Sequence, residues 1–446
     1  MRRFLLHRGN PVRHDRCALQ ILALALGRRI GEYPSDMASL VDDDLTLSCF
    51  GKVLGLLDRL HDCGTVRDRA GNRRLFFDDY CKIVLLFLFN PAVRSLRLLQ
   101  EAAQLPRVAK KLGIKRFSLG SFSEASALFE PERLKQIIAE VGAQAMKLPV
   151  TPELARLKPL LTIVDGTLLA TLPKLAETLC HTRKDGRPHH AWRLHMHLPV
   201  GSLVPERINR TSGSNRRASS ERQQLRQHLQ SQRCYVLDRG FHDASLLNDI
   251  HQAGSSYVCR VRNDIHPQVL QELPLSEATR SAGIVWDRRV KISDYADGVR
   301  PASDHPLRLI RLRVEAHPKR PLDQGRDILV VTSLMDEPPE LIGLIYRYRW
   351  TIELFFRMLK QLLGCRHLLS HRGQGVDIQF YCAVLACLLI YLQTGKKPSK
   401  YMLFMTGLYL SGVASLDDLQ AFLNRPDNTG VKKRAEAERL KKFGIR

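Results

Sequence analysis

The sequence predicts an α/β protein in which a helical N-terminal region precedes a mixed sheet. Three patterns support this fold class. Apolar residues recur at helical spacing between residues 43 and 148, short continuous apolar runs follow Pro149, and strand-like segments without intervening helices lie within residues 284–333. The chain is therefore expected to contain an all-helical region followed by an α/β region that includes a local antiparallel sheet.

The helical part is expected to consist of short helices with recognisable starts. Lys82–Asn90 has the composition of a buried helix, and Ser95 is placed to cap a helix over Leu96–Ala103. A further polar start lies at Ser121 or Ser123. Glycine turns between these helices are compatible with a DNA-binding helix-turn-helix and equally with a plain helical bundle.

Two predicted strands are each followed directly by an aspartate. The apolar run Leu160–Val164 precedes Asp165, and Cys234–Leu237 precedes Asp238. Because ligands of α/β sheets bind beyond the carboxyl ends of the strands, the two side chains are expected to converge. A single aspartate in such a position is more often a turn former or a helix cap, so neither residue alone indicates catalysis.

The remaining segments complete the predicted sheet and its helices. Ala191–Pro199 is predicted to be a strand, Asn209–Ser220 a mobile basic loop and Ser219–Gln230 a helix. A long helix is expected over about residues 340–363, after two prolines. Four further strands are predicted at Ser256–Arg262, Ile284–Ile292, Leu307–Val314 and Asp327–Ser333.

The chain of 446 residues carries a large excess of positive charge. Lys and Arg total 69 against 45 Asp and Glu, which gives a formal net charge of +24. Hydrophobic residues make up 44% of the sequence, which excludes a disordered or fibrous protein. Such a charge attracts polyanions, so nucleic acid is the expected partner and an anionic membrane surface is the second possibility.

Several features predict a cytoplasmic protein. The ten cysteines include no Cys-x-x-Cys pair, as expected for buried thiols in a reducing compartment. The apolar run Phe380–Leu392 is shorter than the roughly 20 residues of a membrane span and is expected to be a core helix. Ala18–Leu26 resembles a secretory leader, but the arginines that follow it disfavour that interpretation.

The long predicted helix carries a polar stripe. Tyr346, Arg349, Glu353 and Lys360 fall within about 60° of one another at 100° per residue. The stripe places the Glu353 carboxylate among phosphate-binding groups. Together with the two strand-end aspartates it makes three carboxylates, whose hard oxygens suit Mg²⁺ or Mn²⁺. The alternative is a solvated helix face with an Arg349–Glu353 ion pair worth about 0.3–0.5 kcal/mol.

The spacing Tyr-x₂-Arg-x₃-Glu-x₆-Lys resembles the motif of bacterial insertion-sequence transposases of the insertion sequence four (IS-four) type. Asp165, in Ile163-Val-Asp-Gly-Thr167, resembles the first catalytic aspartate of that family. Asp238, in Asp238-Arg-Gly-Phe241, resembles the second. The strand-rich segment at about 267–334 resembles the β-rich insertion of the family, and the resemblance covers roughly residues 45–395.

The resemblance implies an RNase H-like catalytic core that binds two Mg²⁺ ions, replaceable by Mn²⁺, through Asp165, Asp238 and Glu353. It implies metal-dependent cleavage of DNA at the ends of an insertion sequence and joining of the 3′-hydroxyl ends to target DNA. The implied partner is double-stranded DNA, and a homodimer on the paired ends is expected.

The resemblance also implies DNA-binding residues and a division into domains. Phosphate contacts are implied for Tyr346, Arg349 and Lys360. Trp350 is a candidate for base stacking or a core residue, and Arg239 for a phosphate contact or a structural ion pair. The expected domains are a basic extension (1–42), a helical DNA-binding domain (43–150), the catalytic domain (151–395, interrupted at 267–334) and a helical basic tail (396–446).

Two other functions are compatible with these residues. One is a metal-dependent DNA nuclease on the same core that cuts without joining. The other is a catalytically inactive DNA-binding relic or regulator, for which a damaged set of acids would be the sign. All three acids are present in this sequence.

Overall fold

The computed structural model describes most of residues 48–425. The longer exceptions are residues 64–72, 145–151, 171–178, 183–187, 215–219, 293–301, 314–326, 364–367, 395–400 and 409–413. Neither residues 1–47 nor the tail 426–446 are part of the description. The predictions for the N-terminal extension, for the leader-like run and for most of the basic tail therefore fall outside the described residues.

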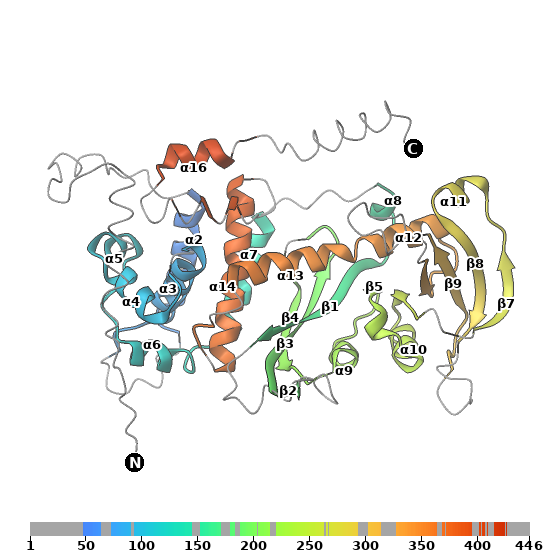
Figure 1. Cartoon of the computed structure of the whole chain (residues 1–446), viewed down its shortest axis with the longest axis horizontal. Helices are drawn as coiled ribbons and strands as arrows, with labels where there is room; N and C mark the ends of the chain where they lie inside the picture. Colours follow the sequence, from blue (N-terminus) through green and yellow to red (C-terminus); the bar gives the residue numbers. More distant parts are fainter. Residues whose placement is uncertain are drawn as a thin grey trace, which may run out of the picture. The chain divides into compact units, whose positions relative to one another are not determined.

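Every element described between residues 48 and 144 is a helix (Figure 1). The helices are α2 (Ser48–Asp58), α3 (Phe77–Phe89), α4 (Leu96–Gln104), α5 (Pro106–Leu112), α6 (Leu119–Ala125) and α7 (Arg133–Gln144). The Ser95 hydroxyl accepts the Leu98 N–H at 3.2 Å, which confirms the predicted cap of α4.

The start of α6 differs from the prediction. Ser118 caps this helix, because its hydroxyl accepts the Ser121 N–H at 3.0 Å. The start predicted at Ser121 or Ser123 is therefore wrong, and the first polar residue of the serine-rich stretch is the one that takes the cap. The preceding helix α5 ends at Gly113, whose φ of 67° is a left-handed conformation that glycine adopts without strain.

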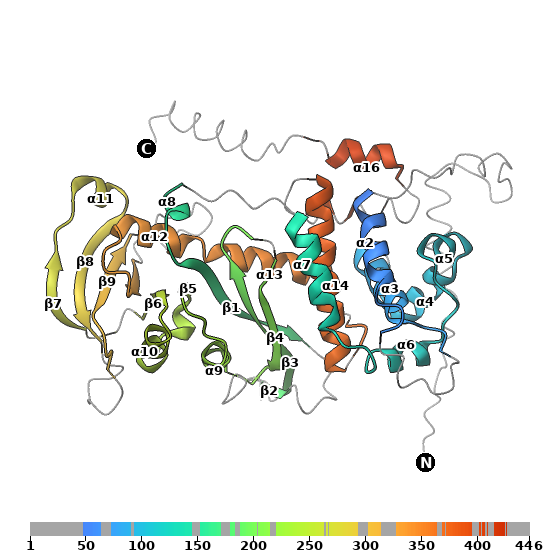
Figure 2. The ribbon, with the colours of Figure 1, turned by 180° about the vertical axis from the view of Figure 1, so that it is seen from behind.

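The apolar helix α14 (Gly373–Thr394) packs against α2, α3, α7 and α13. Figures 1 and 2 show it beside α7 from opposite sides. Among the helices that the structure describes, it alone is long and apolar enough to cross a membrane, and 89% of its apolar window is buried inside the protein. This burial confirms the core helix predicted at Phe380–Leu392.

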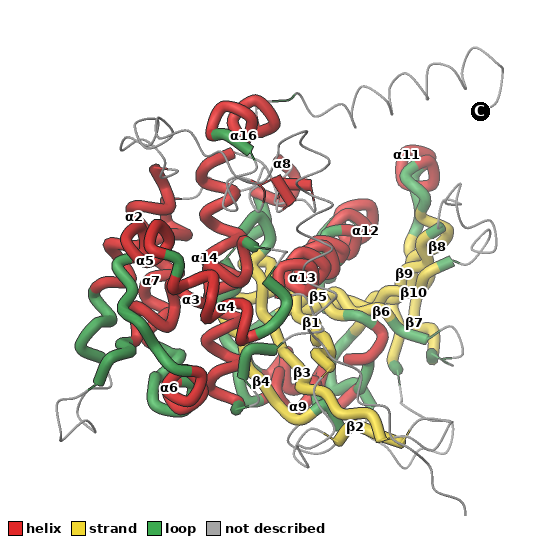
Figure 3. Tube along the Cα trace, turned by 60° about the vertical axis from the view of Figure 1, so that its left-hand side comes forward, coloured by secondary structure: helices red, strands yellow, loops and turns green. Residues whose placement is uncertain are grey.

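The described strands join in one mixed sheet (Figure 3). Their order is β2-β3-β1-β5-β6-β10-β9-β8-β7, and β4 also pairs with β3. The strands are β1 (Leu160–Ala170), β2 (Leu179–Thr182), β3 (Pro188–Pro199), β4 (Arg207–Ser212), β5 (Arg233–Leu237), β6 (Ser256–Arg260), β7 (Gln268–Leu273), β8 (Ile284–Lys291), β9 (Leu307–Leu312) and β10 (Ile328–Thr332).

Parallel pairing is confined to the centre of this sheet. β1 runs parallel to β5 and β5 parallel to β6, whereas the other described pairings are antiparallel. β10 pairs with β6, so the strands β7–β10 continue the central sheet. The short helices α8 (Pro152–Ala155) and α11 (Glu277–Ser281) lie outside it, and α16 (Leu416–Leu423) follows α14.

Helices cover both faces of the central strands. On one face, Val164, Leu237 and Cys259 share a core cluster with Leu246 of α10 (Ala244–Gln252), and α9 (Glu221–Arg226) also packs here. Successive strand residues point to opposite faces. The other face is therefore covered by α12 (Pro339–Arg347), which contacts β5 and β6, and by α13 (Trp350–Leu363), which contacts β1 (Figure 1).

The predicted loop at Asn209–Ser220 is wrong in its first part, because residues 207–212 form β4. The strand is polar, yet each of its positions is half-buried against β3. The His195 ring and the Thr211 hydroxyl hydrogen-bond at 2.7 Å, and the Arg210 guanidinium lies 4.2 Å from the centre of the Trp192 ring. These cross-strand pairs stabilise a strand that its composition does not predict.

Two further predictions about local structure are wrong. β1 continues past Asp165 to Ala170 because β3 still pairs with it there, so this aspartate lies within a strand rather than at its end. The single helix predicted at 340–363 is two helices, because α12 ends at Arg347 and α13 begins at Trp350.

Candidate active site

Asp165 and Asp238 follow the last paired residues of two neighbouring parallel strands. The pairing of β1 with β5 ends at Val164 opposite Leu237, and an aspartate comes next in each strand. Val164 and Leu237 point toward α9 and α10. Because side chains alternate along a strand, both aspartates lie on the α12–α13 side of the sheet. The convergence predicted from the sequence is therefore present in the structure.

Asp165 is a strongly perturbed carboxyl group. Burial raises its pKa to about 7, and the negative charges of Glu221 and Asp238 act in the same direction. The Gly166 N–H, which donates to Asp165 Oδ1 at 2.7 Å, and the Arg349 guanidinium favour the charged form without restoring the usual pKa. A carboxyl group in this environment gains strongly from a nearby cation.

Arg349 lies between α12 and α13, and its positive charge interacts with the acids of the site. It is 5% exposed, and one of its terminal nitrogens donates to Glu353 Oε1 at 2.7 Å. Burial opposes its charge, but Tyr346, Asp238 and Glu353 together hold the pKa of the guanidinium above its usual value. Its Nε is buried with no hydrogen-bond partner. Arg349 thus compensates the carboxylates from inside the protein.

Tyr346 completes the group from the last turn of α12. Its hydroxyl donates to Asp238 Oδ1 at 3.4 Å, and the Arg349 guanidinium lies 5.6 Å from the centre of its ring. Burial raises the pKa of this phenol to about 12, so it remains a hydrogen-bond donor. The helix break does not separate Tyr346 from Arg349, although the continuous helical stripe predicted from the spacing is not formed.

The other predicted DNA-binding residues lie at the edge of this group. Trp350 is 51% exposed, and the Arg349 guanidinium is 5.5 Å from the centre of its ring, so Trp350 is not the core residue of the alternative interpretation. Arg239 is exposed in the turn after Asp238. Lys360 is half-buried about two turns after Glu353 on α13.

The donor set fits a divalent cation in its chemistry. Asp165 and Asp238 offer hard carboxylate oxygens, and their mutual repulsion is relieved when a cation lies between them. Within the described part of the chain, no group of three His, Cys, Asp or Glu side chains is spaced to hold a metal ion. The Glu353 carboxylate instead forms an ion pair with Arg349.

The sequence analysis missed Glu221, the first residue of α9. Its carboxylate forms an ion pair with Arg193 of β3, and each of these side chains is 15% exposed. Its charge raises the pKa of Asp165. Nothing in the polar stretch around Glu221 marks this role, because only the packing of α9 against β1 brings it to the aspartates.

Gly166 has no side chain where Glu221 lies, and this predicts a measurable effect of Gly166→Ala. A Cβ here would overlap Glu221 Oε1 and lie 2.9 Å from Glu221 Cδ, so the glutamate must move. We expect the free energy of unfolding to fall by about 1–3 kcal/mol in denaturant titrations. Gly240→Ala is the control, because its Cβ would lie 3.8 Å from Glu221 Oε2, an ordinary contact. Equal losses in the two variants would contradict the prediction.

Comparisons with known proteins find similarity to transposases. Residues 156–389, a range that contains all three acids, match the family model "Transposase DDE domain". The chain is 26% identical over 163 residues to the putative transposase y4zB of Sinorhizobium fredii, a match covering 36% of this chain and 43% of that protein. It is 24% identical over 314 residues to a probable transposase for the insertion sequence element IS5377 of Geobacillus stearothermophilus, covering 68% and 76%.

Among solved structures, a piggyBac transposase synaptic complex with hairpin DNA is similar at a TM-score of 0.42 and 12% identity. The similarity covers 90% of this chain and 86% of that one. The family assignment depends on the sequence match, which spans more than half of the chain and includes the aspartate pair and both helices of the site. The chain belongs to the transposase DDE domain family.

Proposed function

We propose that this protein is a DNA transposase that cleaves the ends of an insertion sequence and joins their 3′-hydroxyl groups to target DNA. The observation that carries the proposal is the grouping of Asp165, Asp238 and Glu353 around the buried Arg349, inside the range matched by the family. Both relatives carry transposase names, and the net charge of +24 suits a DNA partner.

The sheet supports an RNase H-like core as the finer fold. The order β4-β3-β1-β5-β6, with β4, β3 and β1 antiparallel and β1, β5 and β6 parallel, has the strand order and directions of that fold. On this proposal the segment at about 267–334 is the β-rich insertion of the catalytic domain 151–395. The helices of 43–150 form the domain that recognises the DNA ends.

In the proposed site, Asp165 and Asp238 would hold divalent cations, two Mg²⁺ ions or Mn²⁺, with Glu353 as the third acid. Such ions would supply activation of a water or a 3′-hydroxyl and stabilisation of the leaving oxygen of phosphoryl transfer. Tyr346 fixes one oxygen of Asp238, because its hydroxyl donates to it. Arg349 orients Glu353 through their hydrogen bond, and its positive charge reduces the electrostatic repulsion between the buried acids.

Trp350 is proposed to stack on a DNA base, since half of this indole is exposed beside the site. Trp350→Ala is expected to weaken binding of end DNA by about 5- to 150-fold, because one stacked base is worth ~1–3 kcal/mol. Fluorescence anisotropy at fixed salt measures this. Leu354→Ala is the control, since Leu354 is similarly exposed (48%) on the same helix and has no ring to stack. Unchanged affinity in Trp350→Ala would show that the indole does not touch DNA.

The proposed function is tested with DNA carrying the ends of the element, purified full-length protein and Mg²⁺. Cleavage at the element end and joining to a target plasmid, both lost in Asp165→Ala, would establish the transposase. Cleavage without joining would favour a nuclease on the same core. Binding with neither reaction would identify an inactive DNA-binding relative. Element ends supplied on separate fragments would also test for the proposed homodimer, through paired-end complexes on native gels.

A further inference from the structure

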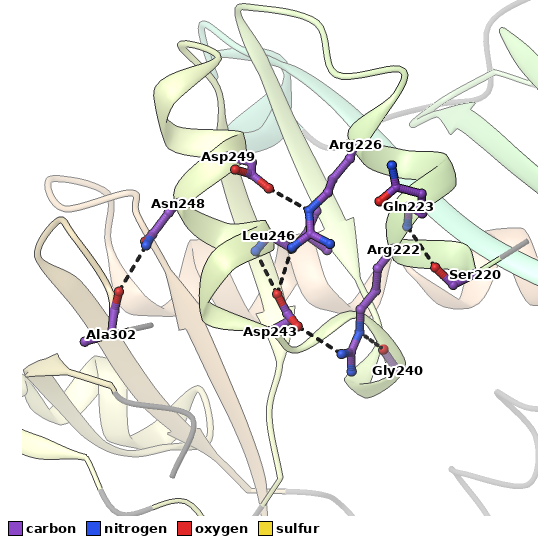
Figure 4. A network of polar contacts seen from close by, with 10 residues as sticks. All are labelled: Ser220, Arg222, Gln223, Arg226, Gly240, Asp243, Leu246, Asn248, Asp249 and Ala302. Atoms are coloured by element: carbon purple, nitrogen blue, oxygen red, sulfur yellow. Dashed lines mark hydrogen bonds and ion pairs between the residues drawn. The ribbon is translucent and has the colours of Figure 1, made fainter. Parts of the chain in front are cut away.

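Helix α9 is fixed firmly to the loop that follows Asp238. Arg222 donates through Nε to the Gly240 carbonyl at 3.0 Å and through Nη1 to Asp243 at 3.1 Å (Figure 4). One turn later, Arg226 donates to Asp243 at 2.9 Å and to Asp249 at 2.6 Å. α9 therefore cannot shift relative to the Asp238 loop without breaking several charged hydrogen bonds.

The first residue of this anchored helix, Glu221, lies beside the backbone that follows each aspartate. Two atoms of the Glu221 carboxylate group occupy the space that a side chain at residue 166 would need, directly after Asp165. The other oxygen, Oε2, lies 3.8 Å from the Cβ position of Gly240, two residues after Asp238. The glycine at position 166 admits the carboxylate beside the backbone that carries Asp165, whereas a Cβ at position 240 would make only an ordinary contact with it.

The place of Glu221 follows from the end of the strand pairing. Beyond Val164 opposite Leu237, β1 no longer pairs with β5, although it continues beside β3. Glu221 approaches this opening from the α9 face of the sheet, and its neighbour Arg193 on β3 compensates part of its charge. Its negative charge acts on Asp165 more strongly than that of Asp238 does.

We propose that Glu221 is a positioning residue of the active site, which sets the spacing between strand β1 at Asp165 and the turn that follows Asp238, and which strengthens the attraction of the two aspartates for a divalent cation. This inference rests on the proposed function, because it assumes that the two aspartates bind the metal. Glu221 acts through the aspartates, by packing on the backbone beside them and by adding a negative charge to the site.

The test is the affinity of the full-length protein for Mn²⁺, measured by isothermal titration calorimetry without DNA. Glu221→Gln keeps the shape and removes the charge, so the affinity is expected to fall on the order of tenfold. Glu221→Asp keeps the charge with a shorter reach and is expected to recover most of that loss, to within about threefold of the natural protein.

Glu206→Gln is the matched control. Glu206 also forms an ion pair with a strand arginine, Arg233, at 2.9 Å. Arg233 lies opposite Leu160, at the far end of the same strand pair. Both glutamine variants lose one ion pair and are expected to melt at a slightly lower temperature, but only Glu221→Gln is expected to lose Mn²⁺ affinity. A role confined to structure would leave Mn²⁺ binding of the two variants alike.

Each outcome decides the question. If the natural protein and Glu221→Gln bind Mn²⁺ equally while Asp165→Asn does not, the inference is wrong and the metal site of the proposed function stands. If the natural protein binds no Mn²⁺, the metal-dependent function fails, and the inference with it. If Glu221→Gln does not fold, the test uses Glu221→Asp instead. A Mn²⁺ affinity of Glu221→Asp lower than about a tenth of the natural value would then overturn the role of charge.

Discussion

Replacing Asp165 with asparagine is expected to reduce DNA cleavage on the order of a thousandfold without destabilising the fold. The amide removes the negative charge that a divalent cation needs, so transition-state stabilisation is lost. It also ends the repulsion of Asp165 by Glu221 and Asp238 in a buried position. The free energy of unfolding is therefore expected to stay the same or to rise by about 1–2 kcal/mol.

Cleavage assays and denaturant titrations on the same preparations measure both effects. Asp249→Asn is the matched control, because Asp249 on α10 makes an ion pair with Arg226 on α9 and is not one of the three proposed catalytic acids. This variant is expected to lose a little stability and to keep cleavage. If Asp165→Asn cleaves DNA at the natural rate, or unfolds more easily than the control, Asp165 is not one of the catalytic acids.

The largest expected effect on stability is that of Arg308→Ala. Arg308 is 3% exposed, pairs with the buried Asp287 at 2.5 Å and donates to the carbonyls of Leu334 and Met335 at 3.1 Å. Its removal leaves a buried carboxylate and carbonyl oxygens without their donor. We expect the free energy of unfolding to fall by about 3–5 kcal/mol, as for other broken buried ion pairs.

Arg308 also fixes the segment that leads into α12. It donates to the Glu337 carbonyl at 2.5 Å, shortly before the helix begins. The loss of Arg308 is therefore expected to displace α12 and, with it, Glu353 on the following helix, so that DNA cleavage falls as well. Arg311→Ala on the same strand is the control, since Arg311 is 44% exposed and its pair with Asp327 is expected to contribute less than about 1 kcal/mol. Similar losses in the two variants would contradict the prediction.

The apolar strands of the core could be predicted from the sequence because their pattern depends on burial alone. The runs at Leu160 and Cys234 are continuous and hydrophobic, as expected for parallel strands with helices on both faces. The two aspartates could be predicted as site residues because each directly follows one of these apolar runs. β4 could not be predicted, because its stability comes from pairs such as Arg210 with Trp192 that lie across the sheet rather than along the chain.

The candidate site shows the same limit. Tyr346, Arg349 and Glu353 could be selected from their spacing, yet the spacing assumes one straight helix, and the break before Trp350 places Tyr346 and Glu353 on different helices. Glu221 could not be selected at all. Its proposed role depends on the space beside Gly166 and on the arginines that anchor α9. Both involve contacts between segments that are far apart in the chain.

The pairing of β10 with β6 has a consequence for the order in which the protein matures on the ribosome. β1, β5 and both aspartates are synthesised well before β10, which pairs with β6, and α12 and α13 follow β10 in the chain. A nascent chain that ends before residue 349 contains every described strand but lacks Arg349 and Glu353. On the proposed mechanism, the capacity to cut DNA is acquired late in translation, and prematurely terminated chains cannot acquire it.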